Sequence, residues 1–304
     1  MTVTTTQKRI ANVSGKPLSS FSVFWAYATI PFRAFIPLAK LLRSIIAVFF
    51  VLQFGRKWGF LKIPVVHVDH PLDKTIPFLP QKVDVYLSFI NFWICPMSML
   101  IKRYGTRNAI PFIREWLELL TVTYDEAGRM YRFRLTTMER PRYHKGQFFT
   151  IHFFDPHLLC VPSLHIAIIV LCHAFYRTLF AREEFTQAER KQWNAELYAS
   201  AVAIAESVLY VKQHSVNCVP TALYMVSKVF PTLFTPIDVV AFINDLFLHP
   251  EGMTDEQAAA VKEHKYDLSG QYKTQERELM ATAHDWCEKA YNIKKDEEGN
   301  DVPG

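Results

Sequence analysis

Two histidines stand at spacings from serine that suit phosphate chemistry. His165 ends the tetrapeptide Pro162-Ser163-Leu164-His165, and His214 follows Ser207 by seven residues. One imidazole can attack phosphorus while a second, in the other protonation state, exchanges a proton with the oxygen that leaves or enters. These residues therefore suggest phosphoryl transfer by a pair of histidines.

A predicted helix end lies next to the first histidine. Pro162 suits the first turn of a helix, and the apolar residues after it predict that this helix reaches about Phe180. Ser163 and His165 would then lie at its N-terminus, where free N–H groups and the helix dipole attract anions.

The second histidine and two cations complete the candidate site. A helix through Ser207 and His214 would place both side chains on one face, two turns apart. Arg140 and Lys212 add charges that can grip phosphate oxygens. A single histidine in an apolar run is more simply a core residue, but this combination is harder to attribute to packing.

Other candidate sites have simpler explanations. Two groups have the composition of metal sites: His152 with Asp155 and His157, and His67 with Asp69 and His70. Loop positions explain both groups better, so we expect no metal and no cofactor. The aromatic runs Phe21–Tyr27 and Phe89–Trp93 are expected to face the core or a membrane.

The ordered stretches resemble the type 2 phosphatidic acid phosphatase superfamily. Pro162-Ser163-Leu164-His165 looks like its second motif, and Ser207–His214 looks like its third, in which the histidine is the nucleophile. Arg140-Pro141 is similar to the end of the first motif. The Lys212-Gln213-His214 ending is similar to the branch that includes inositol phosphorylceramide synthases. The resemblance covers roughly residues 130–230.

The resemblance implies an activity and a role for each residue. The activity would be metal-independent phosphoryl transfer on a phosphorylated lipid, by a phosphatase or a headgroup transferase. His214 would form a phosphohistidine and His165 would be the acid and base. The phosphate would be bound by Arg140, Ser163, Ser207 and Lys212.

The chain departs from the family pattern in three places. Phe133 stands where the first motif begins with Lys, and Val208 stands where Arg often follows the serine. Cys218 replaces the Asp that holds the nucleophilic imidazole in its attacking tautomer. A helix continuing past His214 would bring Cys218 onto the same face, which predicts slow turnover and a gain of activity on Cys218→Asp.

The departures leave alternatives open. Asp155 or Glu206 could orient His214 in place of the missing Asp. A catalytically weakened relative that binds lipid phosphate or a protein partner is one alternative function. A soluble vanadate-binding oxidase of the same architecture, which shares the histidines and cations, is another.

The elements that must position these residues are predicted to be helices. Of the 304 residues, 50% are hydrophobic and only 10 are Gly, which favours a packed core over Gly-rich turns. Pro111–Tyr124 has a helical apolar stripe, Thr254–Gln257 forms a capping box, and Gln275–Tyr291 is rich in helix formers. Only Lys62–Asp69 and His152–Pro156 suggest short extended pieces. We therefore expect an all-α bundle of the phosphatidic acid phosphatase/haloperoxidase-like type, with its site at helix ends.

Run length and charge point to a membrane. Val85–Ile101 and Pro156–Tyr176 are uncharged over a spanning length, whereas Ser44–Phe54 is too short by itself. The first 250 residues carry 27 bases and 16 acids, and the remainder carries 7 bases and 13 acids. Without a nucleic-acid motif, this basic, aromatic body favours a phospholipid surface or another phosphorylated substrate over nucleic acid. We expect a multi-pass or membrane-associated protein.

The predicted organisation has three parts. Residues 1–16 are expected to be disordered, 17–250 to form the helical domain, and 251–304 to form an acidic helical extension. The five cysteines lack CxxC spacing, so buried free thiols are expected.

Overall fold

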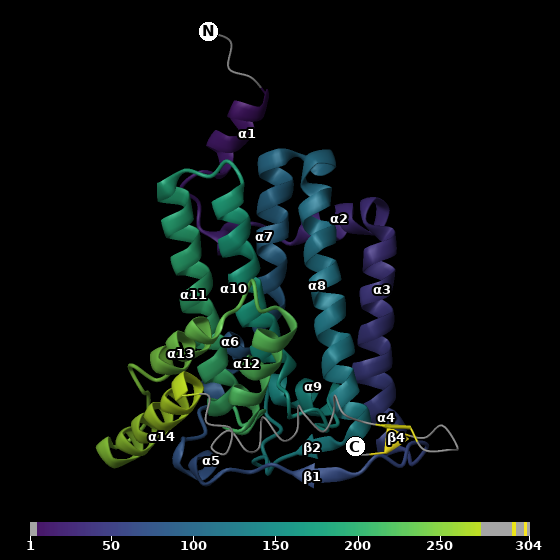
Figure 1. Cartoon of the computed structure of the whole chain (residues 1–304). Helices are drawn as coiled ribbons and strands as arrows, with labels where there is room; N and C mark the ends of the chain where they lie inside the picture. Colours follow the sequence, from purple (N-terminus) through teal and green to yellow (C-terminus); the bar gives the residue numbers. More distant parts are fainter. Residues whose placement is uncertain (1–4, 275–293, 296–300, 303–304) are drawn as a thin grey trace.

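Long helices standing side by side form the body of the molecule (Figure 1). The computed structural model describes residues 5–274, 294–295 and 301–302, most of which are helical. The long helices are α3 (Phe35–Ile45), α7 (Phe89–Tyr104), α8 (Thr106–Phe133), α10 (Leu164–Arg182) and α11 (Gln187–Tyr210). The helical class predicted from the sequence is confirmed.

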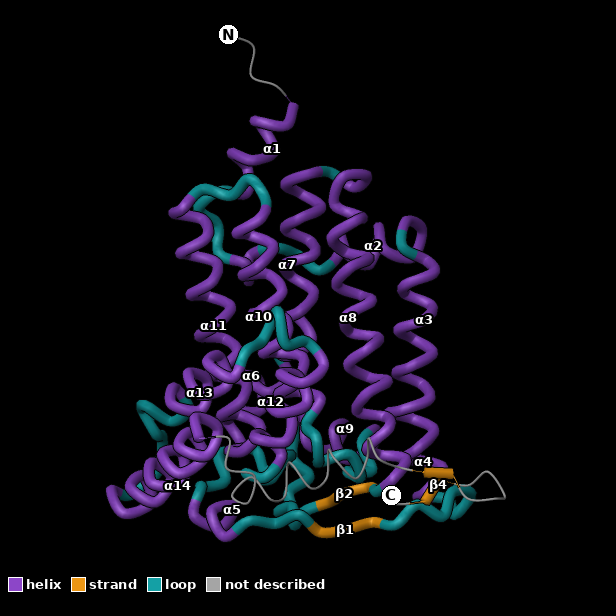
Figure 2. Tube along the Cα trace, in the orientation of Figure 1, coloured by secondary structure: helices purple, strands orange, loops and turns teal. Residues whose placement is uncertain are grey.

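Most of the other elements, one of them 20 residues long, lie toward the lower end of the bundle in Figure 1. These are α4 (Leu52–Lys57), α5 (Pro71–Thr75), α6 (Val83–Leu87), α9 (Gln147–Phe154), α12 (Cys218–Val229), α13 (Pro236–Asp245) and α14 (Asp255–Thr274). Figure 2 shows the parallel pair β1 (Val65–His67) and β2 (Leu135–Thr137) at this end. A second small sheet pairs β3 (Lys294–Lys295) with β4 (Asp301–Val302).

The upper end carries the first two helices, α1 (Thr5–Val13) and α2 (Phe24–Arg33) (Figure 1). A buried ion pair also lies toward this end, where Arg103 Nη1 is 2.7 Å from Glu189 Oε1. Glu189 closes a capping box with Thr186 at the start of α11, so the same carboxylate begins one helix and ties it to another.

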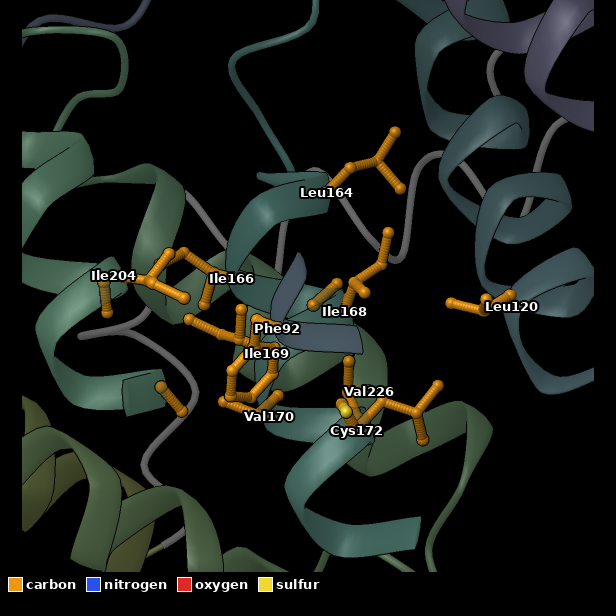
Figure 3. Close-up of a cluster of buried hydrophobic side chains, with 14 of the residues drawn as sticks. Phe92, Leu120, Leu164, Ile166, Ile168, Ile169, Val170, Cys172, Ile204 and Val226 are labelled. Atoms are coloured by element: carbon orange, nitrogen blue, oxygen red, sulfur yellow. The ribbon is translucent and has the colours of Figure 1, made fainter. Parts of the chain in front are cut away.

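Helix α10 runs through the centre of the core. It is largely apolar and packs against α7, α8, α11 and α12, as expected of a helix with little surface toward solvent. Figure 3 shows Ile166, Ile169 and Cys172 of α10 among side chains from neighbouring helices. Trp116 stacks on Phe175 at 5.4 Å between ring centroids, which joins α8 to α10.

Helices α3 and α4 form one continuous rod through a π-helical stretch, Ile46–Val51. The rod passes close to α8 at Gly128, where a Cβ would lie 2.6 Å from Val48 Cγ2. The predicted run Ser44–Phe54 is thus part of a longer helical segment, Phe35–Lys57, and is not limited to its own length. Lys40 and Arg43, the charged residues just before this run, lie within helix α3 and do not end it.

Three segments of the described chain are long and apolar enough to cross a membrane. They are Phe35–Lys57, Pro80–Tyr104 and Leu164–Arg182. The last two contain or overlap the two runs predicted to reach spanning length. These segments are compatible with membrane association.

Several local predictions can be compared with the structure. Lys62–Asp69 does contain a strand, Thr254 does cap α14 with Gln257, and the four described cysteines are free and buried. The prediction of an extended His152–Pro156 is wrong, because α9 continues through Phe154. Residues 5–13 form α1, where no ordered element was expected, and its Val13 is fully buried. The predicted helix Gln275–Tyr291 lies outside the described residues.

Candidate functional site

The structure brings His165 and His214 together. His165 is the second residue of α10, and His214 lies in the loop after α11. Because α10 and α11 pack as neighbours in opposite directions, the start of one meets the end of the other. His214 Nε2 is 3.3 Å from His165 Nδ1, and the ring centroids are 5.4 Å apart. Both rings can therefore contact a single phosphate.

The helix before His214 ends earlier than predicted. Helix α11 stops at Tyr210, and Lys212 has a left-handed φ of 55°. Ser207 and His214 therefore do not share a helical face, and the Ser207 hydroxyl donates to the Ile204 carbonyl at 2.7 Å. The predicted helix through His214 is absent because the chain turns after Tyr210, where residues 211–217 form a loop that is held by contacts on both sides.

One side of the loop sets the tautomer of His214. Its Nδ1 lies 3.3 Å from the carbonyl oxygen of Cys160. A carbonyl can only accept, so Nδ1 carries the proton and Nε2 keeps its lone pair. Nδ1–H of His165 then donates to that lone pair. Burial, with the nearby His165 and His157, lowers the pKa of His214 well below its usual value, so the ring is neutral near pH 7.

Cys218 does not occupy the position of an orienting group. It begins α12 and is fully buried in a small cluster with Val68, Met138, Cys160 and Val161. The expectation that a continuing helix places Cys218 over His214 is wrong, because the chain turns between Tyr210 and Cys218. The neighbouring Cys160 supplies the orienting group through its main chain.

His157 supports the same loop from the segment that joins α9 to α10. Its Nε2 is 2.9 Å from the carbonyl oxygen of Gln213, the residue before His214. His157 has a left-handed φ of 62°, and its N–H donates to Asp155 at 2.8 Å. This conformation directs a buried imidazole to the peptide that carries the candidate nucleophile.

Helix α5 holds the other side of the loop. Asp73 accepts hydrogen bonds from the Ser215 hydroxyl at 2.6 Å and from the Val216 N–H at 2.8 Å. The ammonium of Lys212 donates to the carbonyls of Asp73 and Ile76. Lys212 is therefore engaged in fixing the loop, and burial lowers its pKa.

A pocket of about 520 Å³ opens onto the two histidines; we call it the aromatic pocket. The His165 ring packs against Tyr86 and Phe89, at 4.9 and 4.5 Å between centroids. Most of the remaining lining is apolar and comes from the α3–α4 rod, α7 and α9: Ile45, Phe49, Ile90, Trp93, Ile151 and Phe154. This size and lining suit a lipid chain.

The remaining predicted residues lie around this centre. Arg140 Nη1 donates to Gln213 Oε1 at 3.0 Å, and Arg140 lines an adjacent pocket. Ser163 is fully buried, and its hydroxyl accepts from the Ile166 N–H as the N-cap of α10. The structure thus joins His165 and His214, places Arg140 beside them through Gln213, and engages the two serines and Lys212 with main-chain groups.

The alternative sites can also be placed. Within the residues that the structure describes, no three His, Cys, Asp or Glu side chains are arranged to hold a metal. In the first group, His157 lines the aromatic pocket, whereas His152 lines the pocket that contains Arg140. In the second group, His67 is exposed beside Asp69. Glu206, proposed as a substitute partner for His214, accepts from the Phe247 N–H at 2.5 Å instead.

Sequence reasoning missed four contributions to the site. They are the rings of Tyr86 and Phe89, the imidazole of His157, the main chain of Cys160 and the carboxylate of Asp73. The Phe89–Trp93 run was expected to face the core or a membrane, but Phe89, Ile90 and Trp93 line the pocket. No local pattern marks a main-chain carbonyl as an orienting group.

Comparison with protein-family models, curated proteins and solved structures found no match to this chain.

Proposed function

We propose that this protein is a membrane enzyme that transfers a phosphoryl group from a phosphorylated lipid through a phosphohistidine on His214. The observation that carries the proposal is the His165–His214 pair, 3.3 Å apart between ring nitrogens, at the aromatic pocket. Motif order supports it, since Arg140-Pro141, Pro162–His165 and Ser207–His214 follow in the sequence expected of the type 2 phosphatidic acid phosphatase superfamily.

The first half-reaction uses the lone pair on His214 Nε2. The nitrogen attacks phosphorus, an N–P bond forms, and the P–O bond to the lipid alcohol breaks. Because the attacking and leaving atoms lie on opposite sides of phosphorus, the phosphate must enter between the rings and replace their direct hydrogen bond. His165, which must enter this step as the imidazolium with a proton on each ring nitrogen, gives its Nδ1 proton to the departing alkoxide and is left neutral.

The second half-reaction reverses these roles. His165 takes a proton from water or from an acceptor alcohol, whose oxygen attacks the phosphohistidine. The new O–P bond forms as the N–P bond breaks, and His214 returns to its neutral state. Water as acceptor makes the enzyme a phosphatase, and an alcohol makes it a headgroup transferase.

Positive charge for the transition state comes from two sources. The first N–H groups of α10, those of Leu164 and His165, have no acceptor within the helix and lie at the wall of the pocket. Arg140, bonded to Gln213, is close enough to His214 to lower its pKa. Both favour the charge on the equatorial oxygens of the phosphoryl group.

The test compares wild type with His214→Ala and His165→Ala on detergent-solubilised protein. Phosphate release from phosphatidic acid and other lipid phosphates should fall by about 10³ or more in both variants, as for paired catalytic groups elsewhere. Incubation with ³²P-labelled phosphatidic acid should label wild type rapidly and His165→Ala slowly, because His165 also assists the first step, and should not label His214→Ala. A folded wild type that binds the lipid phosphate without releasing phosphate would instead support a non-catalytic binding protein.

A further inference from the structure

A second pocket, of about 430 Å³, adjoins the aromatic pocket and is rich in positive charge. We call it the cationic pocket. Its charged and polar lining consists of Arg56, Lys57, Arg140, His152 and Asp155. Its walls are completed by Val65, Pro156 and Leu158. Burial and the neighbouring Arg140 lower the pKa of His152 to about 4, so near pH 7 the pocket holds three cations and one carboxylate, that of Asp155.

Within the part of the chain that the structure describes, these cations lack carboxylate partners. Among the described residues, Arg103, Arg177 and Arg182 all form ion pairs, whereas no carboxylate oxygen lies within 4.0 Å of Arg56, Lys57 or Arg140. Two of the three are nevertheless held in place. Arg56 Nε donates to the Ile63 carbonyl at 2.9 Å, and Arg140 Nη1 donates to Gln213 at 3.0 Å.

Like charges held together repel one another, and an anion between them would relieve that repulsion. The Nη atoms of an arginine fork suit a phosphate in particular, because they donate in parallel to two of its oxygens. The pocket is therefore a candidate site for a phosphate group.

The two pockets share their walls. Asp155 lines both of them. Helix α9 separates the two pockets, with Ile151 and Phe154 on the aromatic side and His152 on the cationic side. The α3–α4 rod lines the aromatic pocket with Phe49 and then, further along, the cationic pocket with its last two residues. A single amphipathic molecule can occupy both.

We propose that the cationic pocket binds a second phosphate group, carried on the headgroup of the lipid whose first phosphate reacts at His214. This proposal rests on the proposed function and narrows its substrate class to lipids with a further phosphate on the headgroup. The hydrocarbon chain lies in the aromatic pocket. Arg56, Lys57 and Arg140 receive the added charge.

The experiment measures binding rather than turnover. Full-length protein carrying His214→Ala, in detergent, is titrated calorimetrically with dioctanoyl phosphatidylinositol and with its 4-phosphate. The 4-phosphate should bind about ten-fold or more tightly, the scale of one or two charge-assisted contacts. Adding Arg56→Gln and Lys57→Gln should remove most of this preference. Arg114→Gln with Lys191→Gln removes the same charge at exposed positions in the first halves of α8 and α11 and should leave the preference intact.

Further arms separate the possible outcomes. Lys57→Gln alone, at an exposed residue, should reduce the preference even if the double variant fails to fold. Soluble inositol 1,4-bisphosphate that binds as tightly as the lipid would overturn the lipid-borne assignment in favour of a free phosphate compound. Equal binding of both lipids, or equal losses in the control variant, would overturn the site itself. If wild type hydrolyses lipid phosphates but does not bind the 4-phosphate more tightly than phosphatidylinositol, the second phosphate site is refuted and the proposed function stands. If it binds the 4-phosphate more tightly but hydrolyses no lipid, the proposed function is refuted and the anion site stands.

Discussion

The tautomer of His214 depends on one main-chain acceptor, the Cys160 carbonyl. A carbonyl that accepts from Nδ1–H fixes the tautomer of the ring. Unlike a carboxylate, it carries no full charge that would stabilise an imidazolium. In the proposed mechanism this suits His214, which would stay neutral until it attacks. His157 adds support from behind, by fixing the Gln213 carbonyl.

The substitution Cys218→Asp is expected to destabilise the protein, not to activate it. The new carboxylate would lie in a fully buried apolar cluster, where an unpaired charge costs several kcal/mol. Thermal unfolding and phosphate release of Cys218→Asp and of the control Cys218→Ala measure both effects. A folded Cys218→Asp protein with faster turnover would show that the side chain reaches His214 after all.

The burial of His214 also predicts how stability depends on pH. Its folded pKa is lowered, while an unfolded histidine titrates near about 6.5. Below about pH 6.5 the unfolded state therefore binds a proton that the folded state does not, so stability is full above that pH and falls as the pH falls.

Melting temperatures between pH 7.5 and 5 check this expectation. The decrease should be smaller in His214→Gln than in wild type, with His67→Gln, at an exposed position, as the control. Identical slopes in wild type and His214→Gln would contradict the burial of a neutral ring.

Among the elements, the antiparallel pair α10 and α11 positions the two histidines, and the upper end of α11 is fixed by the Arg103–Glu189 pair. Breaking a buried pair leaves one charge without a partner. We expect Glu189→Gln to cost about 3–5 kcal/mol of unfolding free energy, whereas Arg182→Gln, in a half-exposed pair with Glu115, should cost about 0–1 kcal/mol. Chemical denaturation in detergent distinguishes them, and equal costs would mean that the Arg103 charge is hydrated.

At the scale of the whole molecule, apolar side chains are exposed along the α3–α4 rod. Leu42 and Ile46 are exposed on it, Phe35 is exposed at its first residue, and Trp58 is exposed directly after its last. The 23 residues of Phe35–Lys57 extend about 35 Å, enough for the roughly 30 Å core of a bilayer. Aromatic side chains near the ends of such a segment suit the membrane interfaces.

The full chain should therefore remain with membranes during alkaline carbonate extraction and dissolve only in detergent. Ile46→Lys should weaken this retention, because a lysine at the centre of a span costs about 2.5–3.5 kcal/mol. The control is Lys40→Gln, which changes an exposed charge on the same rod without adding one and should leave retention unchanged. A monodisperse wild type without detergent would refute membrane insertion.

The sequence by itself determined the helical class, the helix that begins after Ser163, the cap at Thr254 and the two histidines. Each of these is encoded by residues a few positions apart, through capping, periodicity or motif spacing.

Only the tertiary structure decided how His214 is held. Cys160 and His157 reach its loop from more than 50 residues away, and Asp73 reaches it from over 140. The same long-range contacts ended α11 at Tyr210 and turned the Lys212 ammonium toward the carbonyls of α5 and the residue after it. Main-chain acceptors look alike at every residue, so the acceptor that meets a given imidazole is fixed by packing and not by any local pattern.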